Sequence, residues 1–265
     1  MRDPLLVSAA MHSAGDVLLR RLERFAGLSP DDAALARDLA QRTRLIPAHA
    51  DIVRIGDPPG DLRLIVSGWA CRYRMLEDGR RQIITLLLPG DLTDIHACAF
   101  ARMDHSIGAL TDIHFAEIPH DRIEQAMLAS PAIRRALRLD MLAKAAIQRE
   151  WTVSLGQRTA FERIGHLFCE LYLRLDAAGL AAGTSCEMPI TQTDMADLTG
   201  ITPVHVNRTL QDLRARGLIT LKGRVLDIPD FARLQHDVLF SPDYLHLDER
   251  VVIGRNGAAL EVSCP

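Results

Sequence analysis

Residues 191–224 read TQTDMADLTGITPVHVNRTLQDLRARGLITLKGR and predict two short helices joined by a tight turn. Thr191 or Thr193 can cap the first helix, because a threonine hydroxyl accepts a hydrogen bond from a backbone N–H of the first turn. Gly200 ends this helix, since glycine adopts a left-handed backbone without strain. Thr202, with a proline directly after it, marks the start of the second helix.

The second helix has one apolar side and is followed by a hairpin. Val206, Leu210 and Leu213 recur at helical spacing and therefore lie on one face. Gly217 closes the helix, and residues 218–228, with a Lys-Gly turn, predict a short hairpin. Two helices joined by such a turn pack nearly crosswise, so the second can enter a major groove about 12 Å wide. The stretch therefore predicts a helix-turn-helix with a wing.

The charge of this stretch favours nucleic acid as its partner. Between Thr199 and Arg224 there is one acid, Asp212, and there are five basic residues: Arg208, Arg214, Arg216, Lys222 and Arg224. Phosphate attraction needs such a local excess of positive charge. The alternative is an ordinary helical hairpin with solvated charges, which a capped second helix followed at once by a basic hairpin disfavours.

The whole chain has the composition of a globular protein with more than one domain. Its 265 residues, 48% hydrophobic and 25% charged, can form two cores, and the net charge of −3 makes the remainder acidic on balance. No apolar run reaches the roughly 18 residues that span a bilayer, and the N-terminus lacks a signal-peptide pattern, so we expect a cytoplasmic protein. No phosphate-binding glycine loop, His-Glu-x-x-His or Gly-x-Ser-x-Gly motif occurs, so we expect no enzyme.

The cysteines are dispersed and form no Cys-x-x-Cys pair: they are Cys71, Cys98, Cys169, Cys186 and Cys264. An odd, scattered set predicts reduced, mostly buried thiols and neither a disulfide frame nor a zinc site. His96 lies two residues before Cys98, which is at most half of a metal site, so we expect no bound metal.

Upstream of the helix-turn-helix the pattern changes from helix to strand and back. Residues 1–45 have helical periodicity, with a second helix starting at Ser29. Short alternating runs separated by Gly, Pro and Asp then predict a β-roll, with strands at 51–55, 62–66, 70–75, 83–88 and 115–118. Together these elements predict an α+β protein: a sensor roll (1–130), a dimerisation helix (131–157), a winged helix-turn-helix (158–240) and a C-terminal tail (241–265).

A long helix begins after Ser130 and runs to about Gln157. Its apolar residues follow a stripe close to coiled-coil spacing: Ile133, Leu137, Met141, Ala145, Trp151 and Leu155. A helix of about 25 residues is roughly 38 Å long, which exceeds what one small domain covers. We therefore expect this stripe to form a dimer interface, although packing on its own domain is the alternative.

This order of parts resembles the cyclic-AMP receptor protein / fumarate-nitrate reductase regulator (CRP/FNR) family of transcription factors. The resemblance covers roughly residues 20–240, and its specific motifs are Leu88-Pro89-Gly90-Asp91 and the segment from Gly200 to Arg208. It implies a homodimer that binds a pseudo-palindromic promoter site and contacts RNA polymerase. In such a dimer the two recognition helices lie one helical turn of DNA apart.

The residues of the family's ligand pocket are changed. In members that bind cyclic nucleotides, a Gly-Glu pair holds the ribose and an Arg-Ser pair holds the phosphate. Alignment from the Gly-Asp motif puts Asp94-Ile95 and His105-Ser106 at these positions. Isoleucine cannot bind a ribose hydroxyl, and neutral histidine replaces a guanidinium poorly. These four residues remain the possible effector pocket, but we expect no cyclic AMP.

The cofactors of other family members are not expected either. The iron-sulfur members need a cysteine cluster near the N-terminus, and here no cysteine precedes Cys71. Haem-binding relatives use a roll histidine, for which His96, His105, His114 and His120 are candidates. Histidines at such positions are more often surface or hydrogen-bonded residues, so we expect no haem.

The recognition helix departs from its relatives as well. Well-known members present an Arg-Glu pair and a second Arg four residues later, and only the last is kept, as Arg208. Arginine binds guanine O6 and N7 in bidentate fashion, so Arg208 is the first predicted base contact. Val204 can contact a thymine methyl, and the further base candidates are His205, Asn207 and Gln211. Predicted phosphate contacts are Thr191, Thr193, Thr202 and Lys222.

The sequence thus predicts a dimeric DNA-binding regulator whose roll senses an unidentified signal or has lost sensing. The alternative is a signalling protein that binds a small molecule and whose winged domain binds another protein. The basic bias from Arg208 to Arg224 disfavours that alternative, because protein-binding faces are more apolar or mixed in charge.

Overall fold

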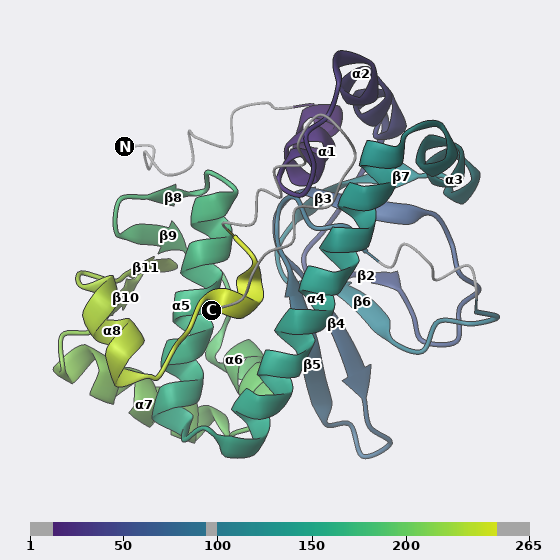
Figure 1. Cartoon of the computed structure of the whole chain (residues 1–265). Helices are drawn as coiled ribbons and strands as arrows, with labels where there is room; N and C mark the ends of the chain where they lie inside the picture. The colour runs from purple at the N-terminus through teal and green to yellow at the C-terminus, as the bar shows by residue number, and fades with distance from the viewer. Residues whose placement is uncertain (1–12, 94–99, 248–265) are drawn as a thin grey trace.

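The structure, a computed structural model, describes residues 13–93 and 100–247 (Figure 1). Asp94 and Ile95, together with His96, Cys98, Cys264 and the tail beyond residue 247, lie outside these ranges. Within the described ranges no helix is both long and apolar enough to cross a membrane. The elements form an N-terminal roll, a long helix and a C-terminal winged domain in that order, which confirms the predicted α+β architecture.

The roll consists of two antiparallel sheets. One has the strand order β1-β7-β3 and the other β2-β6-β4-β5. Their facing side chains, which include Ile65 and Phe115, form a buried core between them. The strands are β1 (Arg42–Ile46), β2 (Asp51–Val53), β3 (Leu62–Ser67), β4 (Ala70–Met75), β5 (Arg81–Leu87), β6 (Ser106–Ala109) and β7 (Ile113–Ile118).

Two roll strands, β1 and β6, were not expected from the sequence. β1 is an exposed edge strand whose side chains, such as Leu45, point mostly to solvent, so it shows no alternation of apolar and polar residues. β6 shows no alternation either, because its four residues, Ser-Ile-Gly-Ala, are all buried. Short runs of small residues resemble turns in sequence, and only their pairing with β2 and β4 identifies this one as a strand.

Three short helices cover one end of the roll: α1 (Ala14–Glu23), α2 (Pro30–Leu39) and α3 (His120–Ala129). Ser29 begins α2 as predicted, with its hydroxyl accepting from the backbone N–H of Asp32 and the Asp32 carboxylate accepting from the backbone of Ser29. Leu18 and Leu22 of α1 pack into a core with Leu64 of β3 and Ile133 of the long helix. The N-terminal helices are therefore part of the same domain as the roll.

The long helix α4 (Pro131–Gln157) lies between the roll and the winged domain (Figure 1). It begins where predicted, because the Ser130 hydroxyl accepts from the backbone N–H of Ile133 and proline occupies the first turn. The buried side of α4 packs against both domains. Ile133 and Leu137 pack against α1 and the roll, and Trp151 packs in the core of the winged domain.

The predicted dimer stripe is therefore wrong at three positions. Ile133, Leu137 and Trp151 are buried within their own chain and offer no surface to a second copy. Met141, Ala145 and Leu155 are exposed and remain available. The physical reason is that α4 has apolar residues on two faces, and helical spacing alone does not separate the face that its own domains cover from the free one.

The winged domain begins with α5 (Ala160–Ala177), whose N-terminus is capped by Thr159. Three further helices follow, together with a sheet of strand order β10-β11-β9-β8. These elements are β8 (Ala181–Ala182), β9 (Ser185–Glu187), α6 (Gln192–Thr199), α7 (Pro203–Ala215), β10 (Thr220–Lys222), β11 (Val225–Asp227) and α8 (Phe231–Asp237). The short ladder of β8 and β9 was not expected, because its alanine and glycine residues are typical of a loop.

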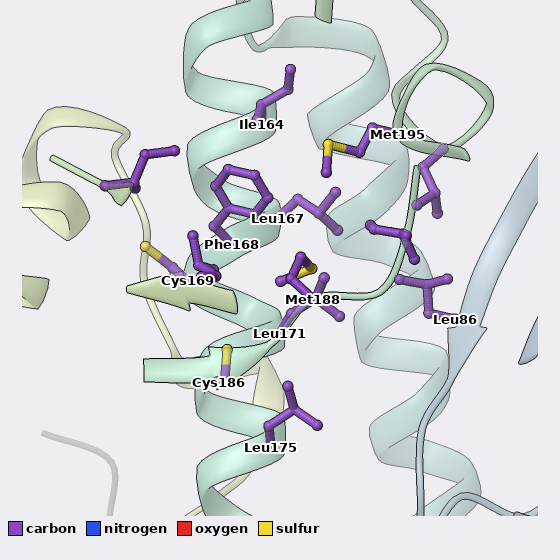
Figure 2. Packing of buried hydrophobic residues seen from close by; sticks show 14 of the residues in the cluster. Leu86, Ile164, Leu167, Phe168, Cys169, Leu171, Leu175, Cys186, Met188 and Met195 are labelled. Carbon is purple, nitrogen blue, oxygen red and sulfur yellow. The ribbon is translucent and has the colours of Figure 1, made fainter. Parts of the chain in front are cut away.

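The core of the winged domain extends into the roll. Phe168 and Leu171 of α5 pack with Met188 and Met195, and Leu86 of β5 joins the same cluster (Figure 2). Cys169 and Cys186 in this cluster, and Cys71 in β4, are free and buried, as expected for reduced thiols. Burial raises the pKa of each of the three thiols to about 12.

Polar contacts on one side and the C-terminal segment on the other hold the winged domain against the roll and α4. Arg81 of β5 reaches α6, with 2.6 Å from its Nη2 to Asp194 and 2.6 Å from its Nε to Asp197. The amide of Gln82 donates to the backbone oxygen of Asp197 at 2.7 Å. On the other side the C-terminal segment crosses from α8 to a short 3₁₀ helix, η3 (Asp243–Leu245), which lies against α4 (Figure 1).

Candidate nucleic-acid interface

The helix-turn-helix is built by the local signals that predicted it. Thr191 caps α6 in a capping box with Asp194, and Gly200 ends the helix in the left-handed conformation with φ 66°. Thr202 caps α7, with Pro203 in its first turn. Each of these residues satisfies or avoids a backbone group that the turn would otherwise leave unpaired. The recognition helix α7 therefore has a defined start and direction.

One side of α7 is buried and the opposite side is open. Val206, Leu210 and Leu213 are at most 1% exposed and pack into the domain core. Four of the predicted base contacts are exposed and lie one turn apart on the other side: Val204, His205, Arg208 and Gln211. A helix with this division can place its open side in a major groove.

Asn207 differs from the other predicted base contacts. It is half-buried, and its side-chain amide donates to the Oε1 atom of Gln192 at 3.2 Å. This bond links α7 to the first turn of α6. Asn207 is thus placed to fix the angle between the two helices, a role that sequence spacing did not indicate.

The basic residues around α7 fall into two groups. Arg216 is paired with Asp212, at 2.9 Å from Nε to Oδ1, and its guanidinium lies 4.4 Å from the ring centre of Phe161. Arg208 and Lys222 are exposed, and within the described part of the chain neither has a hydrogen-bond or ion-pair partner. Their charges are therefore free to meet a polyanion.

The predicted phosphate contacts are all exposed, but they are not equivalent. The Thr191 hydroxyl donates its proton to Asp194 at 2.6 Å, so it can bind a phosphate oxygen only by breaking this bond. The Thr202 hydroxyl accepts from the backbone N–H of His205 at 3.3 Å, which leaves its own proton available. Thr193 and Lys222 point into solvent at the start of α6 and at the tip of the wing.

In the roll, the described half of the predicted effector pocket is already hydrogen-bonded. The Ser106 hydroxyl accepts from the backbone N–H of Ile55 at 3.0 Å. His105 accepts at Nε2 from the Nε of Arg72 at 3.0 Å, so its proton lies on Nδ1, which is 2.6 Å from a carboxylate oxygen of Asp104. Arg72 was not identified from the sequence, because an isolated arginine in a strand gives no signal of its neighbours.

Among residues 13–93 and 100–247, no group of three or more His, Cys, Asp or Glu side chains could hold a metal ion.

Comparison with known proteins agrees with this geometry. Residues 43–130 match the model of a cyclic nucleotide-binding domain, and residues 162–236 match that of a Crp-like helix-turn-helix domain. The nitrogen fixation regulation protein FixK of Bradyrhizobium diazoefficiens is 30% identical over 173 residues, which cover 64% of this chain and 71% of FixK. The transcriptional activator protein FnrL of Cereibacter sphaeroides is 28% identical over 232 residues, which cover 86% of this chain and 92% of FnrL.

Solved structures show the same fold. FixK2 from Bradyrhizobium japonicum superimposes with a TM-score of 0.65 at 24% identity, covering 74% of this chain and 96% of FixK2. The relatives have both domains in the same order as this chain, and the chain has an exposed basic recognition helix. The chain belongs to the CRP/FNR family of DNA-binding transcription regulators.

Proposed function

We propose that the protein acts in the cytoplasm as a homodimer, binds a pseudo-palindromic promoter site through α7 and contacts RNA polymerase from there. The observation that carries the DNA-binding mode is the open side of α7, where Arg208 is exposed and has no partner among residues 13–93 and 100–247. An arginine placed this way can form two hydrogen bonds to one guanine. Thr202 and Lys222 flank it and would fix the register on the phosphates.

The outer side of α4 supports the dimer. Leu142 and Val153, which are 54% and 49% exposed, share this side with Met141 and Ala145. Large apolar side chains rarely line one side of a long helix unless another surface covers it. A second copy of α4 would bury the stripe, and its two-fold axis would match that of a palindromic site.

The roll is proposed to act without cyclic AMP, an iron-sulfur cluster or haem. His105, at the position where relatives carry the phosphate-binding arginine, is held between Asp104 and Arg72 and accepts rather than donates at Nε2. It therefore cannot bind a phosphate oxygen through that nitrogen without losing its bond to Arg72. Cyclic AMP should produce no shift in the melting temperature of the protein.

Fluorescence anisotropy tests the DNA-binding mode directly. The purified full chain is titrated against its own upstream promoter duplex and a scrambled duplex over a salt series. We expect sequence-dependent binding and a steep fall in affinity with salt, because each phosphate contact releases counterions. Equal affinity for both duplexes at every salt concentration would contradict sequence-specific binding.

Two further measurements address the partners. Analytical ultracentrifugation should give a dimer, and Leu142→Asp, which places a charge on the outer side of α4, should give a monomer with weakened operator binding. Arg20→Asp, which changes an exposed side chain on α1, away from the outer side of α4, is the control for surface charge. Transcription in vitro with purified RNA polymerase should change when the operator is occupied, and an unchanged transcript level would contradict a polymerase contact.

A further inference from the structure

The turn of the wing hairpin holds an arginine in an unfavourable backbone conformation. Lys222 of β10 and Val225 of β11 form the last pair of the ladder, so Gly223 and Arg224 make up the whole loop. Both have a left-handed φ, of 58° and 67°, as a type I′ turn requires. Glycine adopts this conformation without strain, whereas the Cβ atom of arginine makes it unfavourable. Turn formation favours glycine or asparagine here, so it does not account for the arginine.

The Arg224 side chain is exposed at the end of the wing. Among residues 13–93 and 100–247 no hydrogen bond or ion pair holds its guanidinium. At Gly223 a Cβ atom would meet nothing within 4 Å, so the tip is also open beside the arginine. The charge of Arg224 is therefore available to a ligand outside the chain.

The backbone of the wing tip is fixed relative to both helices of the helix-turn-helix. On one side, Arg214 of α7 donates to the backbone oxygen of Leu221 at 3.2 Å. On the other side, the backbone N–H of Met188 donates to the backbone oxygen of Arg224 at 2.7 Å. Met188 lies three residues before Thr191, which caps α6. Arg224 therefore has a set position close to the start of α6.

This position has a consequence when α7 lies in a major groove. In a helix-turn-helix the first helix crosses the phosphate backbone at the edge of that groove, and here the start of α6 carries the predicted phosphate contacts Thr191 and Thr193. Beyond this strand of phosphates lies a minor groove, because each strand separates the two grooves. A long side chain at the wing tip can therefore reach across the strand into the minor groove.

The chemistry of an arginine suits a minor groove. Its guanidinium is planar and more weakly hydrated than the ammonium group of lysine, so less free energy is lost when it enters a narrow groove. A·T pairs present only acceptors there, whereas a G·C pair adds the amino donor of guanine, which opposes a second donor. Runs of A·T pairs also narrow the minor groove and strengthen its negative potential, which attracts arginine.

We propose that Arg224 inserts into the minor groove next to the half-site bound by α7 and makes the protein prefer A·T over G·C pairs there. The inference rests on the proposed operator binding and adds a second source of specificity to it. Lys222, on a strand of the same hairpin, binds phosphate and adds affinity without base preference. The strained turn places the guanidinium at the end of the wing, which explains an arginine where glycine would fold better.

Anisotropy titration of the full chain with a set of promoter duplexes tests this inference. Short windows next to each half-site carry A·T, I·C or G·C pairs in turn, where I is inosine. Inosine has the major-groove edge of guanine but lacks its 2-amino group, so a difference between I·C and G·C arises in the minor groove. In one window we expect the wild type to bind the A·T and I·C duplexes alike and the G·C duplex about fivefold more weakly.

Substitutions in the wing separate a base preference from a phosphate contact. Arg224→Gly gives the turn a residue that it favours, so the melting temperature should not fall while the preference for I·C over G·C disappears. Arg224→Lys keeps the charge and should also lose most of this preference. Lys222→Gln, in the same hairpin, is the matched control. It should weaken the binding of every duplex by the same factor and keep the preference.

The inference is overturned if the wild type binds I·C and G·C duplexes equally in every window, or if Arg224→Gly keeps the difference. It is also overturned if Arg224→Gly weakens the binding of all duplexes equally, because Arg224 then binds phosphate only. The scrambled duplex, titrated alongside, tests operator binding itself. A preference for the operator over the scrambled duplex, without any difference between I·C and G·C, overturns the role of Arg224 and leaves operator binding standing.

Discussion

Arginine side chains have different surroundings in the recognition helix and at the junction between the two domains. On α7, Arg208 is exposed and has no partner among the described residues, so its charge is available to a polyanion. At the junction, Arg21 and Arg174 are largely buried and share the carboxylate of Asp91. An arginine side chain therefore stays exposed, as we propose for DNA recognition, or joins two domains, depending on whether an acid from another segment reaches it. Burial and partner decide its function.

The largest effect should come from removing an acid of the buried network of ion pairs at this junction. Asp140 is fully buried, and its replacement in Asp140→Asn leaves Lys144 and part of Arg21 without a counter-charge. We expect a loss of about 3–5 kcal/mol in the free energy of unfolding, measured with urea. Asp38→Asn removes an exposed pair with Arg122 and should cost at most about 1 kcal/mol. Similar losses in both variants would contradict a special role for the buried network.

The same network predicts a pH dependence with a defined sign. Burial alone would raise the pKa of Asp140, but Arg21 and Lys144 overcome this and lower it from 3.8 to about 2. A carboxyl with a lowered folded-state pKa stabilises the protein above its unfolded pKa, and this contribution disappears as the pH falls. The stability difference between wild type and Asp140→Asn should be constant above about pH 4 and shrink toward pH 2. A constant difference over this range would contradict the assignment.

The C-terminal segment provides a second way to disturb the junction. Leu245 is buried and its backbone oxygen holds Arg24, while the Tyr244 hydroxyl donates to Glu170 at 2.9 Å. Leu245→Ala should lower the free energy of unfolding by about 2–4 kcal/mol through the cavity that it leaves. Leu239→Ala changes a side chain that is 70% exposed and should cost less than about 0.5 kcal/mol. Faster trypsin cleavage near Arg158 in Leu245→Ala alone would show that the two domains have separated.

These two regions also differ in how far the sequence predicts them. The helix-turn-helix follows from signals a few residues apart, such as Thr202 before Pro203 and the left-handed Gly200. The junction joins residues that are far apart in the chain: Arg21 and Asp140 are separated by 119 positions, and Arg174 and Asp91 by 83. No local pattern encodes such a pairing. The sequence therefore predicts the recognition helix residue by residue but gives no sign of the junction.

The long helix lies between these two cases. Its bounds and its Ser130 cap were predicted correctly, because both are local. The sequence did not predict correctly which apolar residues its own domains leave uncovered, since Ile133 and Trp151 pack on these domains. A periodic stripe shows that something covers it and does not say what. The sequence also did not indicate the role of Asn207, because its hydrogen bond to Gln192 depends on the angle at which α6 and α7 cross.

The smallest effect, and the one that defines the recognition side, is expected at Arg208. Arg208→Ala should weaken operator binding by about 1–3 kcal/mol per half-site and relax the preference at one base pair, with no change in the melting temperature. Arg216→Ala is the matched variant at the C-terminal end of the same helix, because Arg216 is held by Asp212 and by the ring of Phe161. It should weaken operator and scrambled duplexes alike, and only slightly. Anisotropy titrations of both variants on single-base operator variants distinguish the two roles. If Arg208→Ala weakens all duplexes equally, Arg208 binds phosphate, and the specific contacts must come from Val204, His205 or Gln211.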